Sequence, residues 1–184
     1  AGRDGEAQVS IRFEPMTRGD EAVLLERPDL STQRRPHDSP GPLERVVMPV
    51  YDRFKTTATT RLPVAYLLPS SEQRVAQLLK KHGILVQRVD IPGVATGEKL
   101  RLDTVKVSAQ PAEGHCNVSI AGHFEAMALS VPSRSYLVPT AQPLGTLAAH
   151  LLEPEGLDGV TAWGLLEATL VPGEHHPIIK LNSI

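Results

Sequence analysis

Histidine and glutamate at His-x-x-Glu spacing can bind zinc, and the chain contains one such pair, His150 and Glu153. A catalytic zinc ion needs three protein ligands and an open position for water or substrate. Only His175 and His176 follow as histidines that could supply the third ligand. His150 also lies in an amphipathic segment that Pro154 ends, which favours a histidine on a helix flank and a carboxylate at the helix end. We therefore expect no catalytic, cofactor or metal site, and a small metal-dependent hydrolase using His150 and Glu153 is the weakest interpretation.

His115, Cys116 and His123 form a second group with metal-binding chemistry. On one uninterrupted strand, His115 and His123 would share a face but lie roughly 26 Å apart, at about 3.3 Å per residue. They could bind one ion only if a turn or bulge at residues 121–122 brought them together. Structural zinc sites usually pair ligands at short spacing, and Cys116 is the only cysteine. A partly buried cysteine and surface histidines are the expected arrangement.

Other motifs that carry chemistry are absent from the sequence. There is no Gly-x-Ser-x-Gly elbow, no phosphate-binding Gly-x-x-x-x-Gly-Lys loop and no Gly-x-Gly-x-x-Gly fingerprint. The adjacent histidines 175 and 176 precede Pro177, which is typical of an exposed turn where a transition metal would bind only adventitiously.

Length and composition indicate a folded chain without nucleic-acid chemistry. Its 184 residues are 41% hydrophobic, and sixteen prolines and fourteen glycines fall between short apolar runs, which favours strands joined by turns. The net charge is −2 and the nearest approach to a basic cluster is Arg34–Arg35, so we expect no nucleic-acid partner. No window approaches the roughly 18 apolar residues of a membrane-spanning helix.

The pattern of elements predicts an α+β fold that is rich in short strands. Apolar and polar residues alternate over 8–13, and 46–54 is also typical of a strand. The polar, proline-rich stretch 28–42 between them is the expected boundary. We therefore divide the chain into residues 1–45, a strand with a proline-rich arm, and residues 46–184, an α+β domain.

A βαβ unit is predicted at about residues 64–90. The apolar run 64–68 is ended by Pro69, and Ser70 with Gln73 matches a capping box. An amphipathic helix then ends at Gly83, which suits a left-handed position, before a strand resumes.

Further strands are predicted at 118–124, 127–131, 136–138 and 178–181. The strand pattern over 100–107 has a phase slip at Asp103-Thr104. A second helix is predicted at about 143–152 from an apolar stripe at helical spacing. The members of this stripe are Leu144, Leu147, Ala148, Leu151 and Leu152.

Three blocks of the sequence resemble a known family. The first block begins with Tyr51 to Phe54 and runs through to residues 63–69. The second block is residues 78–84. The third block is Ser135 to Leu144, and it continues through residues 151–154 to 158–160 and Trp163. In this order they resemble the C-terminal, non-catalytic region of bacterial zinc carboxypeptidases of the metallocarboxypeptidase family. The resemblance covers roughly residues 46–181.

The resemblance implies that residues 46–184 are an accessory domain and that a zinc-dependent peptidase domain belongs to the same parent polypeptide. The zinc ligands, the arginine that binds the substrate carboxylate and the general base would all lie in that other domain. The expected partner is thus the catalytic domain, and this chain has no cofactor of its own. Proteins of this group are often exported, so we expect a bacterial, extracytoplasmic location.

Four residues are the predicted contacts with the catalytic domain: Tyr51, Arg53, Phe54 and Trp163. Tyrosine, tryptophan and arginine are enriched at protein interfaces, and here aromatic residues stand among charged neighbours. Such a surface also predicts that the isolated chain forms a homodimer. The alternative interpretation is a stand-alone module that binds a peptide or a carbohydrate, although an aromatic content of 4% argues against a sugar platform.

Overall fold

A computed structural model of the chain describes residues 7–26, 42–111 and 114–183. The chain forms two compact units. Residues 13–57 make the first, hereafter the ribbon unit, and residues 1–12 with 58–184 make the second, hereafter the globular unit. The predicted boundary between residues 45 and 46 falls inside strand β2 (Leu43–Arg61).

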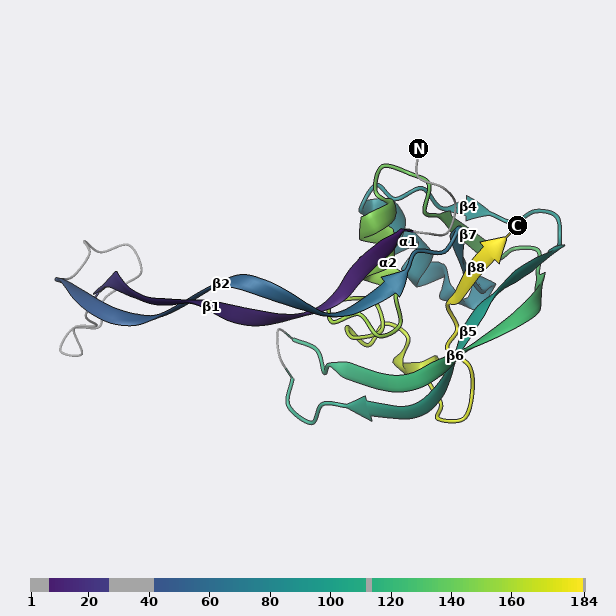
Figure 1. Cartoon of the computed structure of the whole chain (residues 1–184). Coiled ribbons are helices and arrows are strands. Elements are labelled where there is room, and N and C mark those ends of the chain that lie inside the picture. The colour runs from purple at the N-terminus through teal and green to yellow at the C-terminus, as the bar shows by residue number, and fades with distance from the viewer. Residues whose placement is uncertain (1–6, 27–41, 112–113, 184) are drawn as a thin grey trace. The chain divides into compact units, whose positions relative to one another are not determined.

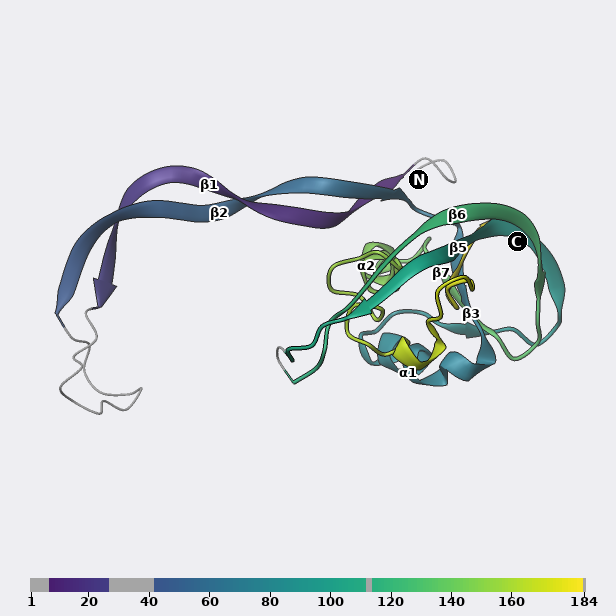
Figure 2. The same ribbon diagram turned by 90° about the horizontal axis from the view of Figure 1, so that it is seen from below.

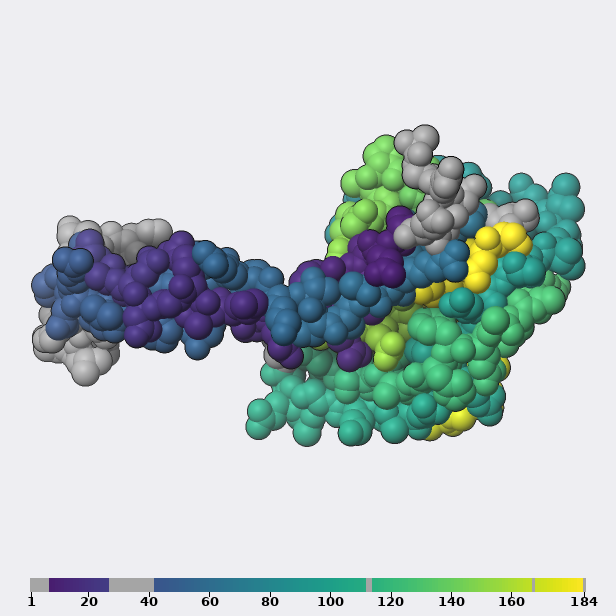
Figure 3. All heavy atoms as spheres, in the orientation of Figure 1, coloured from purple at the N-terminus to yellow at the C-terminus, as the bar shows by residue number. Residues whose placement is uncertain are grey.

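The ribbon unit contains most of two long strands, β1 (Gln8–Glu26) and β2, which together form a two-stranded sheet. Residues 8–12 of β1 and 58–61 of β2 are assigned to the globular unit. Both predicted strands, 8–13 and 46–54, are confirmed, but each is 19 residues long. Arg18 of β1 forms ion pairs of 2.8 Å with Asp52 of β2 and with Glu21. Figure 3 shows the side chains of the two strands winding about each other. The predicted proline-rich loop lies almost wholly outside the described residues.

The globular unit contains a six-stranded sheet in the order β4-β7-β3-β8-β5-β6, in which all neighbouring strands are antiparallel (Figure 1). The strands are β3 (Ala65–Leu68), β4 (Gln87–Arg88), β5 (Gly93–Val107), β6 (Val118–Val131), β7 (Tyr136–Pro139) and β8 (Ile179–Ser183). The chain is therefore rich in β structure with two α-helices, as predicted. The expectation of short strands throughout is wrong, since β5 and β6 have 15 and 14 residues.

The long strands β5 and β6 form a curved hairpin (Figure 2). The predicted phase slip is confirmed, because the register shifts between Leu102 and Thr104 and leaves Asp103 as the extra residue of a bulge. The two short strands predicted at 118–124 and 127–131 are one continuous strand, β6.

Strand β3, helix α1 (Gln73–Lys81) and strand β4 follow one another as predicted. Both strands pair with β7, so they run parallel with β7 between them. The predicted capping box is wrong. Ser70 begins a short 3₁₀ helix, η1 (Ser70–Glu72), in which the Glu72 amide donates to the Pro69 carbonyl at 3.0 Å, so the chain enters α1 without a side-chain cap. Gly83 ends the helix region at φ 80°, the left-handed conformation predicted for it.

Helix α2 (Gly145–Leu152) begins two residues later than predicted, and four members of the predicted stripe, Leu144, Ala148, Leu151 and Leu152, contribute to the core or pack against it, whereas the prediction is wrong for Leu147. Its buried residues are Gly145, Ala148, Ala149 and Leu152, whereas Leu147 is 36% exposed. Leucines occur on both sides of this helix, so the pattern did not decide which side is buried. A side chain at Gly145 would meet the Thr140 carbonyl, which explains why this position is a glycine.

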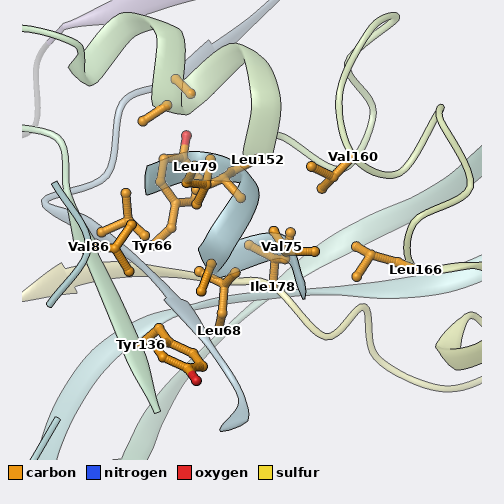
Figure 4. Close-up of a cluster of buried hydrophobic side chains, with 14 of the residues drawn as sticks. Tyr66, Leu68, Val75, Leu79, Val86, Tyr136, Leu152, Val160, Leu166 and Ile178 are labelled. Carbon is orange, nitrogen blue, oxygen red and sulfur yellow. The ribbon is translucent and has the colours of Figure 1, made fainter. Parts of the chain in front are cut away.

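The main core lies between the two helices and the sheet (Figure 4). Tyr66 and Leu68 of β3 face Val75 and Leu79 of α1 and Leu152 of α2. A smaller core includes Leu67, which points to the opposite face of β3 because side chains alternate along a strand. A short 3₁₀ helix, η2 (Glu167–Thr169), follows the loop after α2. In the described residues, no helix is long and apolar enough to cross a membrane.

Candidate functional site

A groove of about 540 Å³ lies on the globular unit, beside the outer face of α1. Its apolar lining comes from α1, α2 and the loop that follows α2. The apolar residues are Leu78, Leu151, Val160, Trp163 and Leu165. This volume is within the range of small-molecule and peptide side-chain pockets, about 300–1,000 Å³.

Trp163 is held in a fixed orientation at the edge of the groove. Its indole Nε1 donates a hydrogen bond of 2.5 Å to Asp158 Oδ1. Its ring stacks on His115, with the centroids 3.9 Å apart and the planes at 12°. The His115 Nε2 atom is in turn 2.8 Å from Asn117 Oδ1. Because Trp163 is still 40% exposed, it offers a rigid aromatic surface whose ordering costs little entropy on binding.

The rim of the groove is basic. Arg74, Gln77, Leu78 and Lys81 are at i, i+3, i+4 and i+7 on α1, and they therefore share one face of the helix. Arg74, Lys81 and the neighbouring His82 are exposed. Asp158 is the one acidic residue that the described side chains contribute to the lining, and its carboxylate already accepts the hydrogen bond from the indole. The groove thus combines an apolar floor with an excess of positive charge.

The four predicted interface residues divide between the two units. Tyr51, Arg53 and Phe54 lie on β2 in the ribbon unit, and Trp163 lies in the globular unit. Tyr51 is 62% exposed and Phe54 is 72% exposed. None of the three aromatic residues is buried in a core, so each is accessible to a partner.

His150 and Glu153 do not form the side-chain pair that zinc would need. Glu153 is 1% exposed, and its Oε1 accepts a hydrogen bond from the Tyr66 hydroxyl at 2.6 Å and forms an ion pair with Lys180 Nζ at 3.1 Å. A carboxylate that is enclosed with an ammonium group does not fit a zinc ion, which would bring a second positive charge to the same atom. Within residues 7–26, 42–111 and 114–183, no group of three or more His, Cys, Asp and Glu side chains could hold a metal.

The charges of Glu153 and Lys180 are compensated inside the core. Lys180 is 4% exposed, donates to Thr60 Oγ1 at 2.6 Å and lies 4.7 Å from the centre of the Phe124 ring. Burial, the charge of Glu153 and their hydrogen bond together raise the pKa of Tyr66 well above its ordinary value. Tyr66 therefore remains a hydrogen-bond donor, and the buried cluster is structural.

The predicted exposed turn at His175 and His176 is wrong for His176, which is 1% exposed. Its Nδ1 accepts the Ile178 amide hydrogen at 3.2 Å, so its Nε2 carries the proton and donates to Thr161 Oγ1 at 3.0 Å. Burial lowers the pKa of His176 from 6.5 to about 4. Through these two hydrogen bonds, the neutral imidazole links Thr161 in the loop after α2 to Ile178, just before β8.

His115 and His123 have different surroundings. His115 stacks on Trp163, whereas His123 on β6 lies 3.5 Å from both Asp103 and Glu125. His175 Nε2 is 2.9 Å from the second oxygen of Glu125, and this hydrogen bond is the main cause that lowers the pKa of Glu125. Asp103, the extra residue of the bulge, thus belongs to a cluster of acidic side chains and histidines together with His123, Glu125 and His175. Cys116 is half-buried and free.

Sequence reasoning identified Trp163 but missed the basic rim. The signal was the spacing of Arg74, Gln77, Leu78 and Lys81, which places two cations and one leucine on a single helical face. The core face of α1 is offset by one residue from it, at Val75, Ala76 and Leu79.

Comparison with known proteins identifies distant relatives. The chain is 28% identical over 124 residues to "Carboxypeptidase 2" of Trichophyton rubrum and to that of Trichophyton equinum, and 27% identical to that of Trichophyton tonsurans. The chain is a distant homologue of these fungal carboxypeptidases. Each match covers 67% of this chain and 23% of the relative, so the chain spans about a quarter of the curated relatives' length. No family model and no solved structure matches the chain.

The predicted relationship to carboxypeptidases is confirmed by these matches. Bacterial origin, a zinc-dependent parent and a position C-terminal to a catalytic domain stay predictions, because the matches do not address them.

Proposed function

We propose that this chain is a non-catalytic accessory region of a carboxypeptidase-like peptidase and that it packs against the catalytic part of the same polypeptide. The observation that carries the proposal is the ribbon unit, a two-stranded sheet with exposed large apolar side chains. They include Met16, Leu24, Leu25, Leu43, Val47, Met48, Tyr51 and Phe54.

A two-stranded sheet is only marginally stable in water, because it buries little apolar surface. Leu43, Val47 and Tyr51 recur at four-residue spacing, which places them on one face of a regular strand, because every second side chain points to the same face. Burying one such side chain stabilises a complex by about 1.5–3 kcal/mol. Several of them together could form an interface of about 600–1,500 Å², the usual size between domains of one chain.

The catalytic part is the proposed occupant of this surface because the chain matches about a quarter of the length of carboxypeptidase relatives. In this proposal, zinc and the residues that act on peptides belong to the catalytic part. The parent protein would be bacterial and would work outside the cytoplasm. Without the catalytic part, the same apolar surface is expected to pair two copies of this chain as a homodimer.

Co-purification tests this proposal. The chain and the remainder of its parent polypeptide, expressed as two separate chains, should purify together. Replacing Val47 and Tyr51 together by lysine should weaken the association at least tenfold, since both lie on the same face of β2 and the change places two charges in an apolar interface. Sedimentation of the two chains at several concentrations gives the affinity.

The matched control is Ile91→Lys with Val94→Lys, two apolar residues of the globular unit that are 82% and 85% exposed. This control pair should leave the affinity unchanged. The proposal is contradicted if the wild-type chains do not associate, or if the ribbon and control variants lose affinity equally.

A further inference from the structure

The groove beside Trp163 is a second candidate binding surface, in addition to the apolar surface of the ribbon unit, and the proposed function gives it no ligand. All of its lining residues belong to the globular unit. It differs from the ribbon in chemistry, because its apolar floor is bordered by cations rather than by further apolar side chains. Its occupant should therefore carry both an apolar group and negative charge.

We propose that this groove binds a short acidic peptide segment, with an apolar side chain against Trp163 and Leu78 and with carboxylates facing Arg74 and Lys81. The volume of about 540 Å³ is enough for a few side chains and small for a whole domain interface. Trp163 would act as the central anchor, since a rigid aromatic side chain in a pocket is the usual centre of a binding surface.

Charge complementarity identifies the polar part of the occupant. Among the described residues, Arg74 and Lys81 form no ion pair, and Asp158 is occupied by the Trp163 indole. Guanidinium and ammonium groups on a groove rim bind carboxylates, and arginine can do so with two parallel hydrogen bonds. Two cations and His82 suit a segment with one or two acidic residues.

The same charges argue against a nucleic acid as the occupant. A nucleic-acid site needs a stripe of cations that follows a phosphate backbone, whereas this chain has a net charge of −2 and the rim carries Arg74, Lys81 and His82. One face of the Trp163 ring is also covered by His115, which leaves a single face for a ligand.

The fluorescence of Trp163 provides a direct measurement, because it is the only tryptophan in the chain. The probe is a hexapeptide of alternating leucine and glutamate, blocked at both ends. We expect it to change the emission of Trp163 in a saturable way. Affinity should fall when salt is raised, because the ion pairs lie at the surface.

Two comparison peptides and two variants make the test specific. Peptides with glutamine in place of glutamate, or glycine in place of leucine, should bind at least tenfold more weakly. Arg74→Gln combined with Lys81→Gln should cause the same loss, whereas Lys80→Gln, an exposed change on the same helix outside the groove, should cause none. Circular dichroism should confirm that all variants stay folded.

The proposal is overturned if the acidic peptide causes no saturable change, if the glutamine peptide binds equally well, or if the double variant keeps full affinity. Because the assay uses only this chain, its result does not depend on whether the ribbon unit associates with a catalytic part.

Discussion

Replacing Lys180 with methionine will destabilise the globular unit by about 3–5 kcal/mol, since removing one partner of a buried ion pair leaves a charge without compensation. The Glu153 carboxylate is 1% exposed and lies 3.1 Å from Lys180 Nζ. Tyr66 would still donate to it, but a single hydroxyl does not replace an ammonium group. Urea unfolding at pH 7, followed by circular dichroism, measures the loss.

The double variant Lys180→Met with Glu153→Gln is the matched control. The glutamine amide oxygen can still accept the hydrogen bond from Tyr66. The glutamine side chain is uncharged, so no unpaired charge is buried in the double variant. Its free energy of unfolding should therefore be close to that of wild type, with most of the loss seen in Lys180→Met recovered. An equal loss in the single and double variants, or a loss below about 1 kcal/mol in the single variant, would show that the pair is not the buried, coupled unit described here.

Acid will destabilise the protein through His176. The buried imidazole has a pKa lowered to about 4, against 6.5 for the ordinary side chain. The unfolded chain therefore binds a proton at a higher pH than the folded chain, and the stability that neutral His176 contributes is present above pH 6.5 and is lost as the pH falls towards 4. The expected loss over this window is about 3 kcal/mol.

His176→Asn isolates this effect from other titrating groups. Asparagine can accept the Ile178 amide hydrogen two residues on, as His176 Nδ1 does, but it does not titrate. Unfolding free energies measured between pH 7.5 and 4 should fall more steeply for wild type than for the variant. Parallel curves would place the acid sensitivity at other groups, such as the exposed cluster around Glu125.

The local features of the fold could be predicted because they depend on neighbours in the sequence. Alternation of apolar and polar residues revealed β1, a strand-like stretch at 46–54 revealed β2, and Gly83 marked the end of α1. The slip at Asp103 identified a bulge that the structure contains. Each of these patterns reflects backbone geometry within a few residues.

Features that depend on distant residues could not be predicted. Leu147 was assigned to the buried side of α2 together with Ala148 and Leu152, but the side that packs on the core also contains Gly145 and Ala149, and Gly145 lies against the Thr140 carbonyl. His176 was expected at the surface, but its partner Thr161 is fifteen residues away. Glu153 was interpreted as a helix-end charge, because nothing local links it to Lys180.

The candidate site was predicted in part for the same reason. The exposed aromatic residues Tyr51, Phe54 and Trp163 were identified by type and by family resemblance. The groove was not, since it forms only where one face of α1 meets the loop after α2. A lysine within the apolar run 178–181 was the available signal of the buried ion pair, because buried lysine requires an acidic partner.

The accessory role is tested most directly by measuring the release of C-terminal amino acids from peptides with zinc supplied. We predict that this chain alone releases none and that its parent polypeptide does. We also expect His150→Ala to leave the parent's activity unchanged, because His150 belongs to α2 and its neighbour Glu153 forms an ion pair with Lys180. Zinc-dependent release by this chain alone, abolished by His150→Ala, would contradict it.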